Sequence, residues 1–141
     1  MLNREQLRSK GLNMARRFRL VTLIDGSQVR IQSLNRAEQR EWRNAVKRKD
    51  GTPDPKKLEY SNDILLAMCV VDEEGKQVFT LGDALSGMFD YWDTQDTTVL
   101  LDATVDHCGL VADAKEIEAR VKNSEATPGN DSSGVAATDT E

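Results

Sequence analysis

The sequence has few of the residues on which most catalytic and metal sites depend. It contains one histidine and two cysteines in 141 residues, and it lacks the GxxxxGK[ST], GxGxxG and GxSxG motifs. A single His107 excludes metal sites that need two histidines, and Cys69 and Cys108 add too few ligands for an ordinary zinc site. These absences argue against an enzyme, a bound metal or a cofactor.

Long apolar runs are also missing. No stretch approaches the roughly 18 apolar residues that span a bilayer, and the N-terminal sequence MLNRE lacks the apolar segment of a secretory signal. We therefore expect a soluble protein with no membrane partner. Both cysteines lie in apolar sequence, which favours reduced, buried thiols. The alternative is a single disulfide bond between them.

The chain is long enough for one ordinary domain, and its net charge of −5 conceals two oppositely charged halves. Residues 1–60 carry 15 Lys and Arg against 7 Asp and Glu, whereas residues 61–141 carry 4 against 17. In one compact domain these halves would attract each other, and on separate surfaces they would attract different partners.

Two β-rich runs, 18–24 and 28–34, flank a DGS sequence at 25–27 and predict a β-hairpin. We expect four apolar residues to share its buried face: Phe18, Leu20, Val29 and Ile31. Because an isolated hairpin is only marginally stable, this face must pack on helices.

The spacing of apolar residues predicts helices over about 36–49, 61–71, 80–89, 94–108 and 112–122. Asn35 with Glu38 has capping-box spacing, and so has Thr80 with Asp83, whereas Gly109 can end the fourth helix. The helix at 61–71 is the most apolar and should form the centre of the core. The predicted fold class is α+β, mostly α-helical, with an N-terminal β-hairpin packed on a bundle of about four to five helices.

The composition changes at both ends of the chain. We predict a flexible basic arm at 1–15, a single α+β domain at 16–122 and a disordered polar tail at 123–141. The tail is rich in Ser, Thr, Gly, Asp and Ala, and it is too polar to bury a core.

Two groups of side chains are candidates for contact with a partner. Phe89, Tyr91 and Trp92 are interleaved with acids that would repel phosphates, so they predict either a protein-binding patch or a corner of the core. The basic residues of the 36–49 helix, where Trp42 should be the buried anchor, either steer an acidic partner or form an ordinary solvated face. The basic residues chosen are Arg40, Arg43 and Lys47.

Two segments resemble a known family. They are VVDEEGKQVFT at 70–80 and KEIEARVKNS at 115–124, and between them lie an acidic Leu-rich helix and a helix closing at CGL, 108–110. In these segments and in the order of its elements, the region from about 20 to 124 resembles the tail assembly chaperones of long-tailed bacteriophages. The resemblance does not cover the aromatic cluster at 89–92 or the basic arm at 1–19.

The resemblance implies a protein without enzymatic activity that binds the tape measure protein, keeps it soluble and helps to recruit tail tube subunits during tail assembly. It also implies a place in the host cell cytoplasm and absence from the mature virion. It leaves the oligomeric state open.

Two other functions compete with this one. A nucleic-acid-binding regulator would use the basic N-terminal half, but the net acidity and the lack of a helix-turn-helix or ribonucleoprotein pattern weigh against it. A structural tail or head-completion subunit is the third hypothesis, and it would be found in purified virions.

Overall fold

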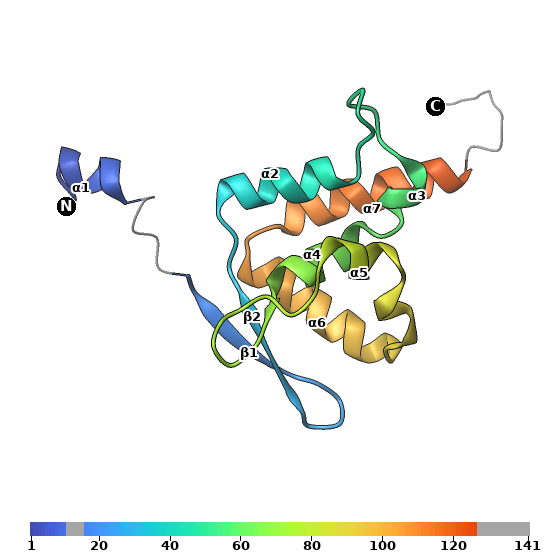
Figure 1. The fold of residues 1–141 in the computed structure, drawn as a ribbon, viewed down its shortest axis with the longest axis horizontal. Helices are drawn as coiled ribbons and strands as arrows, with labels where there is room; N and C mark the ends of the chain where they lie inside the picture. Colours follow the sequence, from blue (N-terminus) through green and yellow to red (C-terminus); the bar gives the residue numbers. More distant parts are fainter. Residues whose placement is uncertain (11–15, 127–141) are drawn as a thin grey trace.

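The computed structural model describes residues 1–10 and 16–126 (Figure 1). In chain order its elements are α1 (Arg4–Ser9), β1 (Phe18–Thr22), β2 (Gln28–Gln32), α2 (Arg36–Ala45), α3 (Pro55–Leu58), α4 (Ser61–Cys69), β3 (Val70–Val71), α5 (Leu81–Leu85), the 3-10 helix η1 (Met88–Tyr91), α6 (Thr94–His107) and α7 (Val111–Ala126). This arrangement confirms the predicted class, α+β and mostly α-helical, with an N-terminal hairpin against a helical bundle.

The predicted arm and tail lie only partly within the described residues. Residues 11–15 of the arm and 127–141 of the tail fall outside them. Within the arm, Asn3 caps the short helix α1 through its side chain, which accepts from the Gln6 backbone N–H. At the other end, α7 runs to Ala126, beyond residue 122, where we expected the domain to end.

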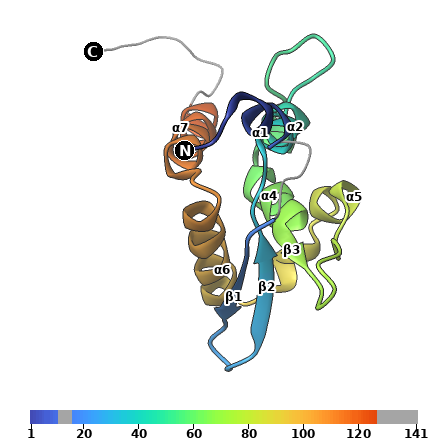
Figure 2. The same cartoon turned by 90° about the vertical axis from the view of Figure 1, so that its left-hand side faces the viewer.

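Helix α4 forms the centre of the core, as predicted. It packs against α2, α5 and α6, and Figure 2 shows α4 between α5 and α6. Six of its residues are buried: Ser61, Ile64, Leu65, Leu66, Ala67 and Cys69. A helix that is apolar nearly all round is stable only when neighbours cover every side of it.

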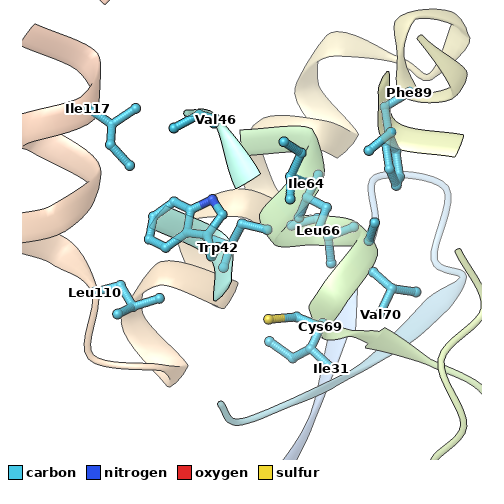
Figure 3. Packing of buried hydrophobic residues seen from close by; sticks show 14 of the residues in the cluster. Ile31, Trp42, Val46, Ile64, Leu66, Cys69, Val70, Phe89, Leu110 and Ile117 are labelled. Carbon is cyan, nitrogen blue, oxygen red and sulfur yellow. The ribbon is translucent and has the colours of Figure 1, made fainter. Parts of the chain in front are cut away.

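Trp42 anchors α2 to this centre, also as predicted. Its side chain is 0% exposed, and its indole Nε1 donates a hydrogen bond of 2.7 Å to the Ser61 backbone oxygen. In Figure 3 the ring lies between Leu110 and Ile117 on one side and α4 on the other. The indole therefore fills space between α2, α4 and α7 while its polar atom stays paired.

Local sequence signals place several helix ends correctly. Asn35 and Glu38 form the capping box of α2, and Thr80 and Asp83 form that of α5. Gly109, at φ 69°, follows the C-cap of α6, where an L side chain would be strained.

Three helices end earlier than the apolar spacing predicts. Helix α2 stops at Ala45 rather than near Lys49, because Val46 leaves the helical conformation at ψ 5° and Lys47 forms a β-bridge with Pro53. Helix α5 stops at Leu85 rather than near Phe89, because Gly87 takes φ 82° and the chain continues as η1. Helix α4 stops at Cys69, because Val70 turns to ψ 125° and pairs with Ile31 in β2.

The sheet has the order β1-β2-β3 with antiparallel neighbours, and its register corrects our prediction of the buried hairpin face. Val21 pairs with Val29 and Arg19 with Ile31, so Val21 and Ile31 are the residues buried on one face. Phe18 and Leu20 lie on the other face, where they are 40% and 59% exposed. The error lies in the choice of face for β1: apolar residues stand on both of its faces, and the register places Val21, not Phe18 and Leu20, on the face of Val29 and Ile31.

Helix α6 lies along β1. His107 Nε2 is 3.0 Å from the Arg17 backbone oxygen, and the Arg17 guanidinium donates to the His107 backbone oxygen at 2.9 Å. Near the hairpin loop, the Ile24 N–H donates to Asp96 Oδ1 at 3.0 Å. These contacts hold α6 beside an edge strand that would otherwise be open to pairing with another chain.

Replacing Trp42 by Phe should lower the free energy of unfolding by about 2 kcal/mol, because a buried hydrogen bond and part of a buried ring are lost. Urea denaturation followed by far-ultraviolet circular dichroism measures the change. The control is Tyr91→Phe, since Tyr91 is 93% exposed and should change stability by less than about 0.5 kcal/mol. Equal unfolding midpoints for W42F and the wild type would contradict the role of the indole as an anchor.

Candidate protein-binding surfaces

The aromatic residues near η1 divide into a packed group and one exposed member. Phe79, Phe89 and Trp92 meet edge to face, with ring centroids 4.9 Å, 5.3 Å and 6.3 Å apart. Phe89 is buried, Trp92 is half-buried and Tyr91 is 93% exposed. Of the three aromatic residues predicted to contact a partner, Tyr91 alone presents its whole side chain, while the others form a corner of the core.

The turn before η1 explains why Tyr91 points outward. Gly87 takes φ 82°, and a Cβ at this position would lie 2.6 Å from Asp90 Oδ2. The chain therefore needs glycine here to turn from α5 into η1. Phe89 then faces the core, while Tyr91 two residues later faces solvent.

Residues 78–93, which we name the α5–η1 segment, expose further apolar side chains that the sequence analysis missed. They are Val78, Leu81 and Met88, at 50%, 47% and 39% exposed. The sequence does hold a clue to one of them, since the Thr80 cap places Leu81 at the start of a helix of five residues. So short a helix has few positions that face the core.

The same region is acidic. From residue 77 to residue 114 the chain has no Lys or Arg and seven Asp. Asp83 belongs to the capping box of α5 and is partly buried, whereas Asp93 caps α6 and is exposed. The exposed apolar groups of the α5–η1 segment therefore stand among negative charges, which suits a partner with both apolar and basic side chains.

The second candidate group lies on α2, and its three members differ in what they contact. Arg43 forms ion pairs with Asp113 at 3.3 Å and Glu116 at 3.1 Å, so it joins α2 to α7. Arg40 and Lys47 are exposed and line a hollow between the two helices, together with Val46, Leu58 and Ile117 among others. No residue of the α5–η1 segment lines this hollow, so the two candidate groups form separate surfaces.

Many arginines of the basic half are engaged within the fold. Arg16 meets Glu38 at 2.5 Å, and Arg19 meets Asp106 at 3.1 Å. Arg17 donates to the His107 backbone, while Arg30 donates to the Glu73 backbone and lies 4.1 Å from the centre of the Phe18 ring. These contacts leave less positive surface for phosphates than the sequence count implies.

Neither a metal site nor a membrane helix is found in the described part of the chain. No group of three or more His, Cys, Asp and Glu side chains among residues 1–10 and 16–126 is placed to hold a metal ion. No helix in these ranges is both long enough and apolar enough to cross a bilayer.

One carboxyl group near the α5–η1 segment has a raised pKa. Asp63 is half-buried in the first turn of α4, and its burial, followed by the charge of Asp90, raises its pKa to about 6. Ionisation of Asp63 is therefore less favourable in the folded chain than in the unfolded chain, and the ionised side chain present at neutral pH destabilises the fold.

Comparison with known proteins gives one likeness. No family model and no curated protein matches the chain. A solved structure described as "Structure of bacteriophage HK97 tail assembly chaperone" matches with a TM-score of 0.48 and 17% sequence identity, covering 72% of this chain and 96% of that chain. The likeness is partial, and that protein is of the family that the sequence resembles.

Replacing Asp63 by Asn should stabilise the protein at pH 7 and not at pH 4. The folded pKa of about 6 lies above the ordinary value of 3.8, so the wild type loses stability as pH rises from about 4 to about 6. Solvent screens this half-exposed group, so we expect a gain of about 1 kcal/mol in the free energy of unfolding at pH 7.

Urea denaturation of both proteins at several pH values measures this difference. Asp102→Asn, which alters an exposed residue on α6, is the control and should show no comparable gain. A D63N advantage that stays constant from pH 4 to pH 7 would show that ionisation of Asp63 is not its cause.

Proposed function

We propose that this protein is a tail assembly chaperone of a long-tailed bacteriophage, which binds the tape measure protein and keeps it soluble before the tail tube polymerises. The observation that carries the proposal is the resemblance of segments 70–80 and 115–124, in their sequence context, to that family. The role includes recruitment of tail tube subunits, takes place in the host cytoplasm and requires no catalytic group. The chaperone leaves before the virion is complete.

The α5–η1 segment is the proposed contact for the tape measure protein. Tyr91 supplies an exposed aromatic ring, and Val78, Leu81 and Met88 supply apolar surface in the same segment. Phe89 and Trp92, which flank Tyr91 in the sequence, pack against each other and so fix the backbone from which Tyr91 projects. An amphipathic helix of the client would place apolar side chains against these groups and basic side chains near the acids.

The basic residues of α2 have a different proposed role, in steering. Arg40 and Lys47 are exposed, whereas Arg43 is already paired with α7. Long-range attraction from exposed charges raises association rates more than it raises affinity. We assign Arg40 and Lys47 to the approach of an acidic partner, such as an acidic stretch of the client or of a tube subunit, and Arg43 to holding the surface in place.

Coexpression with the tape measure protein of the same phage tests the function itself. The chaperone should keep the tape measure protein in the soluble fraction and co-purify with it, and it should be absent from purified virions. A tape measure protein that is equally soluble without it would contradict the proposal, and presence in virions would favour a structural subunit.

Replacing Tyr91 by Ala should weaken binding to the tape measure protein by about tenfold or more, the loss typical of an aromatic anchor at an interface. Because Tyr91 is almost fully exposed, the circular dichroism spectrum and the unfolding midpoint should not change. Titration of the purified full chain against the purified client measures Kd.

The matched control is Ile24→Ala, which removes an exposed apolar side chain at the hairpin loop, outside the proposed surface. It should bind like the wild type. Equal losses for Y91A and I24A, or none for Y91A, would remove the α5–η1 segment from the binding surface.

Reversing the charge of Arg40 and Lys47 together should slow association by about three- to tenfold at low salt. The difference from the wild type should shrink as salt screens the charges. Stopped-flow mixing at two salt concentrations measures the rates, with Arg36→Glu as a single-site control. A change confined to dissociation would mean that these residues contact the client directly and do not steer it.

A further inference from the structure

The fold brings together two cysteines that lie 39 positions apart in the sequence. Cys69 is the last residue of α4, and Cys108 is the C-cap of α6. Both are free thiols, and their Sγ atoms are 3.8 Å apart. Formation of a disulfide bond needs a separation of about 2.0 Å, so a small movement at the ends of two helices would join them.

The two thiols differ in their access to solvent. Cys69 is 0% exposed, within the core cluster shown in Figure 3, whereas Cys108 is only half-buried. Cys108 Sγ lies 3.6 Å from the Gln32 backbone oxygen, beside the hairpin. A reagent in solution can therefore reach Cys108 first, and it can reach Cys69 only through Cys108.

The environment also makes the two thiols chemically unequal. A hydrogen bond from Cys69 lowers the pKa of Cys108, and the Leu34 backbone amide and the Arg17 charge lower it further against the effect of burial. The same hydrogen bond, and then burial, raise the pKa of Cys69. Cys108 is thus the better nucleophile, since the thiolate is the reactive form.

We propose that Cys108 and Cys69 form a thiol–disulfide exchange site, at which a low-molecular-weight disulfide such as glutathione disulfide converts the pair to an intramolecular disulfide. Cys108 is the attacking residue and Cys69 the resolving residue. The site does not depend on the role in tail assembly.

The exchange takes two steps. The Cys108 thiolate attacks one sulfur of glutathione disulfide, so that a mixed disulfide forms and one glutathione leaves as a thiolate, which takes up the proton that Cys108 had lost. Cys69 sulfur then attacks Cys108 Sγ, and the second glutathione leaves with the proton of Cys69. The cysteine pair loses two electrons, and one glutathione disulfide becomes two glutathione molecules.

The product would close a loop around one of the proposed binding surfaces. The α5–η1 segment, residues 78–93, lies within the chain between Cys69 and Cys108. A disulfide would tie the end of α4 to the end of α6, which flank this segment in the sequence, and would restrict its opening. Oxidation would thus fix the scaffold of the α5–η1 segment without altering its exposed side chains.

The test uses the reduced full chain, freed of reductant and incubated with glutathione disulfide at about pH 8, where thiolates are populated. Intact mass spectrometry should show a loss of two hydrogens with no glutathione retained, and peptide mapping should find Cys69 linked to Cys108. Cys69→Ser should retain one glutathione on Cys108, because the resolving thiol is gone. Cys108→Ser should stay unmodified, because Cys69 is buried.

A second experiment uses only the wild type, so its result does not depend on whether either serine variant folds. Brief alkylation of the reduced native chain should label Cys108 and spare Cys69. Equal labelling of both thiols in the native chain would overturn the proposal, as would a stable glutathione adduct on the wild type. So would a native chain that stays reduced while the urea-unfolded chain is oxidised.

Discussion

The structure depends on one constraint: α4 has almost no side that can face water. Because Ser61 to Cys69 is buried nearly all round, α2, α5 and α6 must each cover part of it. The chain then passes without a loop from Cys69 into β3, which pairs with β2, so the same element that centres the helices also fixes the hairpin. Trp42 completes this arrangement, because its indole fills the space between α4 and α7 and bonds to the first residue of α4. A substitution in α4 should therefore disturb both the helical bundle and the sheet.

The opposite charges of the two halves of the sequence meet across this core. Arg19 pairs with Asp106, and Arg43 with Asp113 and Glu116, so the attraction expected from the sequence does occur between the halves. The pairs of Arg19 with Asp106 and of Arg43 with Glu116 are exposed, and such pairs contribute only about 0–1 kcal/mol each, so they orient α6 and α7 more than they stabilise them. Their larger effect is on the charge of the surface. They neutralise arginines of the basic half, whereas the α5–η1 segment has no Lys or Arg, so the negative charge of its acids is not neutralised within the segment.

How far the sequence could predict the structure depends on whether a feature is local. The caps at Asn35 and Thr80, the end of α6 before Gly109 and the burial of Trp42 follow from neighbouring residues, and all were predicted. The hairpin face was wrong because β1 carries apolar residues on both faces, Phe18 and Leu20 on one and Val21 on the other, and only packing on the helices decides which face is buried. The aromatic cluster was found, but which ring faces solvent depends on the left-handed turn at Gly87. The approach of Cys69 to Cys108 depends on how α4 packs on α6, which no local pattern encodes.

The α5–η1 segment combines features that a binding surface for apolar segments requires. Such a surface must expose apolar groups and yet not aggregate, so charge has to stand beside them. Here the packed rings of Phe79, Phe89 and Trp92 hold the backbone, Tyr91 projects from it, and the acids of the same segment supply charge. The arrangement has a cost, because Asp90 on η1 helps to raise the pKa of Asp63 on the central helix. An acid that destabilises the fold is hard to explain by folding alone; under the function we propose, its negative charge serves the solubility of this segment or the recognition of a basic, apolar client.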